Sequence, residues 1–156
     1  MAEKEALMSI GEICNREVVF IQRDAGILEA AQLMRQYHVG DLVVVDAKQG
    51  GRRPVGIVTD RDLVIEVIAE GVDMSKVAVE DVMSFELVTA REEDDILDTM
   101  KRMRAKGVRR VPVVDGDGAL VGILSVDDLL ELLAEEITDL AKIITREQVR
   151  EKEKRK

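Results

Sequence analysis

The sequence predicts an α/β fold in which two pseudo-symmetric units pack into one globule. The first observation is a repeat: the segment from Val18 to Leu63 returns, with one three-residue gap, as Leu87 to Leu129. The second is the pattern inside each copy, where apolar residues spaced three and four apart alternate with continuous β-branched runs. These patterns predict the order strand, helix, strand, strand, helix in each copy. Two copies of one supersecondary unit bury their apolar faces against each other, so we expect a cleft with two related half-sites.

The first unit is expected over residues 8–71. Ile27, Leu28, Ala31 and Met34 have the spacing of one helix face, and Leu42–Val45 is an uninterrupted apolar run typical of a buried strand. The expected elements are a strand at Val18–Ile21, a helix from Asp24 that ends at His38–Gly40, strands at Leu42–Val45 and Pro54–Val58, and a helix from Thr59 or Asp60 to Glu70.

The second unit is expected over residues 80–137, in the same order. The alignment follows from Val43–Asp46, which falls on Pro112–Asp115 at an offset of 69 residues. The expected elements are a strand at Glu86–Thr89, a helix at Asp94–Lys106, a strand at Arg110–Val114, a tight turn at Asp115–Gly118, a strand at Ala119–Leu124 and a helix from Val126. Helical spacing continues through Ile144, so residues 138–156 should prolong this helix into a charged tail.

The composition argues against several classes of function. A net charge of −9 disfavours general binding to a nucleic-acid backbone, and an aromatic content of 2% leaves few platforms on which bases could stack. No apolar run approaches the roughly 18 residues that span a bilayer. One histidine and the single Cys14 do not suffice for a zinc site or an internal disulfide. These features predict a cytoplasmic protein that holds no metal. No nucleophile has a neighbouring base, so we expect that it is not an enzyme.

One local pattern occurs in both units: glycine, an apolar residue, a variable residue, Thr or Ser, two variable residues, and Asp. It occurs at Gly56–Asp62 and at Gly122–Asp128. The hydroxyl residue and the aspartate three positions later fit a helix N-cap with an acidic third residue, which is a common structural feature. The same groups also suit a nucleotide, since a helix N-terminus favours phosphate and a carboxylate can accept hydrogen bonds from ribose hydroxyls. Both interpretations stay open for either motif alone.

Repeat, element order and motifs together resemble a tandem pair of cystathionine β-synthase (CBS) domains, an arrangement called a Bateman module. Further markers are Asp81–Ser84 and Gly107–Asp115, and the resemblance covers about residues 8–137. It implies a sensory or regulatory module that binds an adenine nucleotide or another adenosyl compound in the cleft between the repeats. It also implies assembly as a disc-shaped homodimer.

The resemblance further implies nine ligand-binding residues. Two aspartates would hold ribose hydroxyls, two hydroxyl residues would meet phosphate or ribose, three apolar residues would cradle the base, and two arginines would contact phosphate. In that order they are Asp62 and Asp128; Thr59 and Ser125; Ile57, Leu87 and Val88; Arg109 and Arg110. Arginine suits this role because its fixed fork of donors grips phosphate at two points.

The two half-sites should differ in charge. At the position of Arg109–Arg110 in the second repeat, the first repeat has Gly40–Asp41. The site on Asp62 should therefore receive the arginines, whereas the site on Asp128 should face Asp41, which would repel phosphate. The sequence predicts one good nucleotide site at Asp62 and a second that is weak, empty or filled by a neutral adenosyl ligand.

The predicted function is ligand sensing. An adenine nucleotide such as AMP, ADP or ATP would act as a regulatory ligand, with no cofactor required, and would shift the packing of the repeats or of the last helix to signal to a separate protein. Apolar residues within Leu129–Leu133 offer surface for a homodimer, and neither nucleic acid nor a membrane is expected as a partner. The alternative is a dimerisation or partner-docking module without a small-molecule ligand, in which the two aspartates only cap helices.

Overall fold

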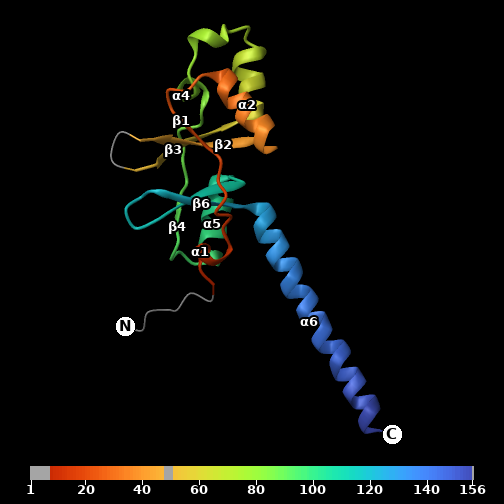
Figure 1. Cartoon of the computed structure of the whole chain (residues 1–156). Helices are drawn as coiled ribbons and strands as arrows, with labels where there is room; N and C mark the ends of the chain where they lie inside the picture. The colour runs from red at the N-terminus through yellow and green to blue at the C-terminus, as the bar shows by residue number, and fades with distance from the viewer. Residues whose placement is uncertain (1–7, 48–50, 156) are drawn as a thin grey trace. The chain divides into compact units, whose positions relative to one another are not determined.

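The computed structural model describes residues 8–47 and 51–155, and the chain divides into two units, Met1–Leu124 and Ser125–Lys156 (Figure 1). The first unit holds two three-stranded sheets, with the strand orders β1-β2-β3 and β4-β5-β6. The second unit consists almost entirely of one helix, α6 (Val126–Lys154), so the predicted long final helix is confirmed up to Lys154. Lys156, the end of the predicted tail, lies outside the described residues. The predicted mixed α/β fold with two related repeats is confirmed, since each repeat supplies one three-stranded sheet.

The first sheet contains β1 (Phe20–Gln22), β2 (Asp41–Asp46) and β3 (Arg53–Thr59). β1 runs parallel to β2 with Phe20 opposite Val43, and β2 runs antiparallel to β3 with Asp41 opposite Thr59. Residues Leu42–Val45 are fully buried because β2 has a cluster on each face. Leu42 and Val44 pack toward the helices, whereas Val43 and Val45 pack against Leu120 of the other sheet. This double burial explains why the run lacks the alternation of a half-exposed strand.

The helices of the first repeat differ in detail from the predicted ones. The bounds are α2 (Ile27–Tyr37), α3 (Asp60–Asp62) and the π-helix η1 (Leu63–Ile68). α2 begins later than predicted because Gly26, its N-cap, forms a backbone bridge to Ala78. Leu28 and Ala31 were expected on the buried face of α2 and are exposed; the buried residues are Ile27, Ala30 and Met34, which lie at the 3.6-residue spacing of a narrower stripe.

The second sheet contains β4 (Ala90–Arg91), β5 (Arg110–Val114) and β6 (Leu120–Ser125), and α5 spans Ile96–Lys106. The predicted strand at Glu86–Thr89 is wrong. Leu87 N donates to Phe85 O (2.9 Å), so the chain turns there, and strand pairing begins only at Ala90, opposite Val113. Asp95 caps α5, accepting hydrogen bonds from Leu97 N and Asp98 N, which sets the start of the helix two residues later than predicted.

The structure contains three short helical segments that the sequence did not predict, and two of them each pack on the repeat to which they do not belong in sequence. They are α1 (Ile10–Ile13), η2 (Met74–Lys76) and α4 (Val79–Val82). α1 begins the first repeat in sequence but binds the second, where Ile10 N donates to Asp94 O (2.9 Å). α4 begins the second repeat in sequence but binds the first, where Val79 N donates to Ala25 O (2.9 Å). Each repeat is thus completed by a helix from the segment that leads into the other.

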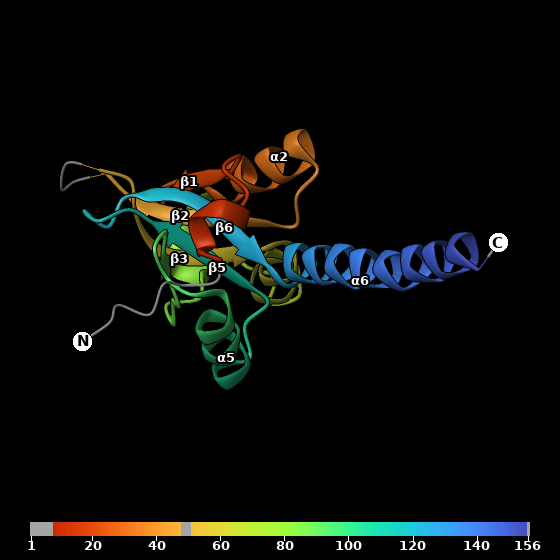
Figure 2. The same ribbon diagram turned by 90° about the horizontal axis from the view of Figure 1, so that it is seen from below.

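The two sheets lie between α2 and α5 (Figure 2). The cluster that includes Val43, Val45 and Leu120 fills the space where the sheets meet, with Val18, Phe20 and Ile123 packed around it. One backbone hydrogen bond also crosses directly, from Leu120 N to Arg52 O (2.8 Å). The repeats therefore share one apolar core, as the duplicated pattern predicted.

Candidate ligand-binding site

Thr59 and Asp62 form a reciprocal capping pair where β3 passes into α3. Thr59 Oγ1 accepts a hydrogen bond from Asp62 N (3.1 Å), and Thr59 N donates to Asp62 Oδ2 (2.9 Å). Both residues are half-buried. Among the described residues, none donates a hydrogen bond to the second carboxylate oxygen, Oδ1. The capping geometry is therefore present, and it leaves one carboxylate oxygen available to a ligand.

Ser125 and Asp128 make the same pair at the start of α6. Asp128 N donates to Ser125 Oγ (3.1 Å), and Ser125 N donates to Asp128 Oδ2 (2.9 Å). The local geometry of the motif is thus the same in both repeats. Any difference in ligand affinity between the two motifs must come from other residues, including the pair between the hydroxyl and the aspartate, which is Asp60-Arg61 in the first motif and Val126-Asp127 in the second.

Ile57 lies beside the segment that leads into the second repeat. Ile57 N donates to Ser84 O (3.4 Å), and Ser84 N donates to Ile57 O (2.9 Å). Leu87 and Val88, the other predicted base-binding residues, follow three and four positions later and are half-buried. The segment Ser84–Thr89, here called the crossing segment, thus begins beside β3 at Ile57. Ile57 of β3 and Leu87 and Val88 of the crossing segment were predicted to contact the same base.

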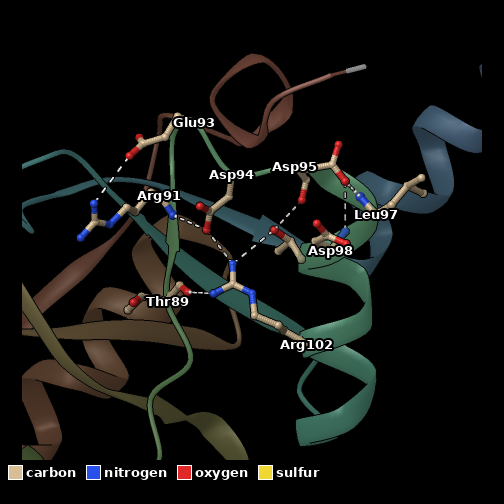
Figure 3. Close-up of polar contacts among 9 residues, drawn as sticks. Thr89, Arg91, Glu93, Asp94, Asp95, Leu97, Asp98 and Arg102 are labelled. Carbon is tan, nitrogen blue, oxygen red and sulfur yellow. Dashed lines mark hydrogen bonds and ion pairs between the residues drawn. The ribbon is translucent and has the colours of Figure 1, made fainter. Parts of the chain in front are cut away.

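Arg102 of α5 fixes the end of this crossing segment (Figure 3). Its Nη1 donates to Thr89 O (3.2 Å), and its Nη2 donates to Asp94 Oδ2 (2.6 Å). Asp94 Oδ2 also accepts from Arg91 N (3.0 Å), so one carboxylate joins the helix to the loop that precedes it. The residue 69 positions earlier is Leu33, which can make none of these hydrogen bonds. The two repeats therefore hold this segment by different means.

Arg110 and Asp41 form an ion pair between the repeats. Arg110 Nε lies 2.9 Å from Asp41 Oδ1, and the Asp41 side chain is only 10% exposed. Burial raises the pKa of the Asp41 carboxyl; the Arg110 guanidinium opposes this rise, and the nearby Asp60 carboxylate adds to it. Asp41 stands opposite Thr59 in the sheet, so this pair brings Arg110 to the end of the first sheet where the Thr59–Asp62 motif begins.

The two arginines do not both lie at the Asp62 site as cations without an acidic partner, as the sequence suggested. Arg110 reaches the first repeat, but its Nε is engaged by Asp41. Asp41, which was expected beside the site on Asp128, lies opposite Thr59 within its own sheet. Arg109, one residue before Arg110, is exposed. A phosphate near Thr59 would meet a charge pair rather than two unengaged cations.

A cavity of about 580 Å³ opens beside β1, and its residues were not among the predicted site residues. Its walls are largely apolar and aromatic: Val18, Val19, Phe20, Leu33, Tyr37 and Val39. Asn15 and Glu17 supply polar groups. A volume of this size falls in the range of small-molecule sites, roughly 300–1,000 Å³.

Most of the chain matches the model of one protein family, and it does so twice. The CBS domain model matches residues 10–69 and residues 79–135. The chain belongs to the CBS domain family. Its two matched segments contain one copy each of the Thr59–Asp62 and Ser125–Asp128 capping pairs.

Similar proteins include other CBS-domain chains. An uncharacterised protein of Methanopyrus kandleri is 36% identical over 80% of this chain and 62% of its own length. The CBS domain-containing protein YhcV of Bacillus subtilis is 35% identical over 79% of this chain and 84% of its own length. This chain thus spans less than two thirds of the first of these relatives. The crystal structure of the CBS domain pair of protein MJ0100, in complex with 5′-methylthioadenosine and S-adenosyl-L-methionine, has a TM-score of 0.68 at 25% identity and covers 81% of this chain and 99% of that one.

The cavity residues could have been found from the CBS repeat itself. Val18 and Val19 lie 69 positions before Leu87 and Val88, which the resemblance singled out. Carrying the role across the repeat would have named them for the first half-site. No feature of the sequence singled out Tyr37 as a site residue, because it lies at the end of a helix and outside both motifs.

Two further properties of the described residues concern membranes and metals. Over residues 8–47 and 51–155, no helix combines the length and the apolar content needed to cross a bilayer. The same residues contain no group of three or more His, Cys, Asp or Glu side chains placed to hold a metal ion.

Proposed function

We propose that this CBS pair is a regulatory module that binds an adenosine-containing ligand at its first repeat, with an adenine nucleotide (AMP, ADP or ATP) as the first choice. One observation carries the proposal: the available Oδ1 of Asp62 and an aromatic-lined cavity lie at the same end of one sheet. The same end receives Arg110 from the second repeat. A nucleotide needs these three environments for its ribose, base and phosphate.

The cavity suits the adenine ring. The chain has only three aromatic residues, and two of them, Phe20 and Tyr37, line this cavity. Flat aromatic and apolar side chains favour a planar ring by stacking and by burial of apolar surface. Ile57, Leu87 and Val88 remain proposed as further contacts to the base, from the crossing segment and β3.

Strand geometry gives the distance between Val18 of the cavity and Thr59 of the capping pair. Val18 precedes Phe20 by two residues, and Phe20 pairs with Val43, so Val18 is level with Asp41. Asp41 in turn pairs with Thr59. Neighbouring strands are about 4.8 Å apart, so Val18 and Thr59 are roughly 10 Å apart across the sheet, which is the scale of a nucleoside. A base in the cavity would place its ribose near Asp62.

The phosphate would meet Arg110. Asp41 engages only Nε, so both terminal nitrogens of the guanidinium keep donors for a phosphate oxygen. Thr59 Oγ1 would donate its hydroxyl proton, and Arg109 is proposed as a second cation. Ser125 and Asp128 are proposed as the hydroxyl and carboxylate of a second half-site. The first repeat would supply no arginine to it, because β2 has Asp41 at the position where β5 has Arg110.

The solved structure of the MJ0100 CBS pair supports the adenosine class. Both molecules named with it, 5′-methylthioadenosine and S-adenosyl-L-methionine, contain an adenosyl group. The shared part of these ligands is the base and ribose, which in this chain correspond to the cavity and Asp62. Phosphate recognition is the part that Arg110 would add.

The ligand would be a regulator rather than a cofactor, and we assign no catalytic residue. Binding would involve β3 of one repeat and Arg110 of the other, so its affinity would depend on how the repeats pack. A ligand with different affinities for two packings shifts the balance between them, which is sufficient to signal to a separate protein. The chain has a single cysteine, Cys14, which is consistent with a reducing cytoplasm.

The experiment is calorimetric titration of AMP, ADP, ATP and S-adenosylmethionine into the wild type and Asp62→Asn. The amide keeps one oxygen for the hydrogen bond from Thr59 N and replaces Oδ1 by a donor. Loss of a charge-assisted hydrogen bond to ribose should lower the affinity by about tenfold or more. Asp81→Asn is the matched control, because Asp81 accepts the same capping bond from Ala78 N (2.9 Å) in α4. Equal affinities for wild type and Asp62→Asn would exclude Asp62 from the site.

The alternative, a docking module without a ligand, is favoured by one observation. Both capping pairs are complete, so the motifs already have a structural role. Thermal unfolding with each ligand separates the two functions, since a ligand at a hundredfold its Kd adds about 2.7 kcal/mol. No stabilisation by any of these ligands or by NAD would favour the docking module.

A further inference from the structure

The compact unit Ser125–Lys156, which is the second unit of the structure, has an apolar stripe along α6. Leu130, Leu133, Ile137, Leu140 and Ile144 follow each other at intervals of three, four, three and four residues. This is the spacing of the a and d positions of a coiled coil, which face a partner helix. All five side chains are between 45% and 65% exposed. A continuous row of exposed leucines and isoleucines is unfavourable in water and marks an interaction surface, so we expect the stripe to be buried against a partner.

The charges of α6 are divided between its two halves. From Val126 to Asp139 the helix has six acidic residues and no basic one. From Leu140 to Lys154 it has five basic residues against three acidic ones. The partner that complements this pattern is acidic where α6 is basic and basic where α6 is acidic. A second α6 in the opposite direction has this distribution.

We propose that α6 pairs with α6 of a second copy of this chain as an antiparallel two-helix coiled coil. A parallel pair would place the two acidic halves side by side, where like charges repel. In the antiparallel pair, Leu133 packs against Ile144 of the second copy, and Ile137 packs against its Leu140. The symmetry of the pair repeats both contacts, which gives four wholly apolar layers.

The residues that flank the stripe suit close approach. Ala134 and Ala141 occupy the e positions beside the apolar row, and they oppose each other in this register. Small side chains there let the helix axes come near without steric conflict. The proposal does not depend on nucleotide binding, because every residue it uses lies in the second unit beyond Leu129.

The first test compares two double variants of the full chain by sedimentation velocity. Ile137→Asp with Leu140→Asp places charge in the stripe, whereas Thr138→Asp with Thr145→Asp adds the same charge on the opposite face. The stripe variant should raise the dimer dissociation constant by about a hundredfold or more, and the control should change it little. Circular dichroism of both variants checks that α6 remains helical. A monomeric wild type at roughly 100 μM, or a stripe variant that dimerises like the wild type, would overturn the proposal.

The second test reads the direction of the pair by disulfide formation in a Cys14→Ser background. Leu133→Cys and Ile144→Cys chains, mixed under oxidising conditions, should cross-link to each other. Neither chain alone should cross-link efficiently, because each position lies far from its own copy in an antiparallel pair. Self-cross-linking of both would indicate a parallel pair and contradict the proposal. Added salt should weaken an antiparallel dimer, whose halves attract, and strengthen a parallel one.

Discussion

At the residue scale, the glycine that opens each CBS motif is required by packing. A Cβ at Gly56 would lie 2.7 Å from Met83 Sδ and 2.7 Å from Ser84 O. At Gly122 it would lie 2.9 Å from Asn15 O and from Cys14 Sγ. In each case the neighbour belongs to the segment that crosses from one repeat to the other. A backbone oxygen at this distance cannot withdraw without breaking the hydrogen bonds that hold the crossing segment.

We therefore expect Gly56→Ala to destabilise the protein by about 1–3 kcal/mol, the cost of overpacking a fixed site. Gly116→Ala is the control, because a Cβ there meets nothing within 4 Å. Urea unfolding of the two variants provides the comparison. A loss of stability no greater for Gly56→Ala than for Gly116→Ala would show that the crossing segment is mobile enough to yield.

Residue types alone predicted Thr59 and Asp62 correctly as a pair, because a capping box is a local arrangement within four residues. The same reasoning could not predict that Asp41 and Arg110 meet. They are 69 positions apart, and their contact depends on how the two repeats are packed. The cavity beside β1 was missed for another reason: its strand residues Val18 and Val19 could have been named from Leu87 and Val88 by the repeat, but Tyr37 lies outside both motifs.

At the element scale, the exchange of α1 and α4 joins the repeats. Both helices have only four residues, too few for any periodic pattern to predict them. The predicted strand at Glu86–Thr89 failed because apolar β-branched residues also suit an unpaired crossing segment. The sequence predicted β2, β3, β5 and β6 to within one residue at each end, because these strands lie in apolar runs flanked by turns.

The exchange predicts that damage to one crossing helix appears in the other repeat. Ile10 and Val79 occupy equivalent positions, and both are fully buried. Ile10→Ala should cost about 2–5 kcal/mol and accelerate hydrogen exchange in the second repeat, at the Ile123 amide that bonds Asn15 O. Val79→Ala should act instead on the first repeat, at the Ile57 amide that bonds Ser84 O. Acceleration confined to the repeat that follows each helix in sequence would contradict the exchange.

At the scale of the whole molecule, the Asp41–Arg110 ion pair links the two repeats at the proposed phosphate position. Its carboxyl is buried, and its pKa is raised above the 3.8 of a free side chain. A raised folded-state pKa means that folding favours the protonated form. This contribution to stability is fully present below the unfolded-state pKa and is lost as the pH rises through the folded-state pKa. In the ion pair with Arg110, Asp41 is a buried carboxylate, so a phosphate bound at the proposed position would compete with it for Arg110.

Asp41→Asn should relieve this competition. The amide removes the negative charge beside Arg110, so the variant should bind AMP about three- to tenfold more tightly than the wild type at pH 7. Adenosine affinity should change little, because adenosine carries no charge that the Asp41 carboxylate could repel. As the pH falls through the raised pKa, the wild type should approach the variant, and comparison at each pH cancels the titration of the phosphate itself. Asp98→Asn, at an exposed partner of Lys101, is the charge-matched control. Equal gains for AMP and adenosine would mean that Asp41 acts on the packing of the repeats and not on the phosphate, since only a direct electrostatic effect distinguishes the two ligands.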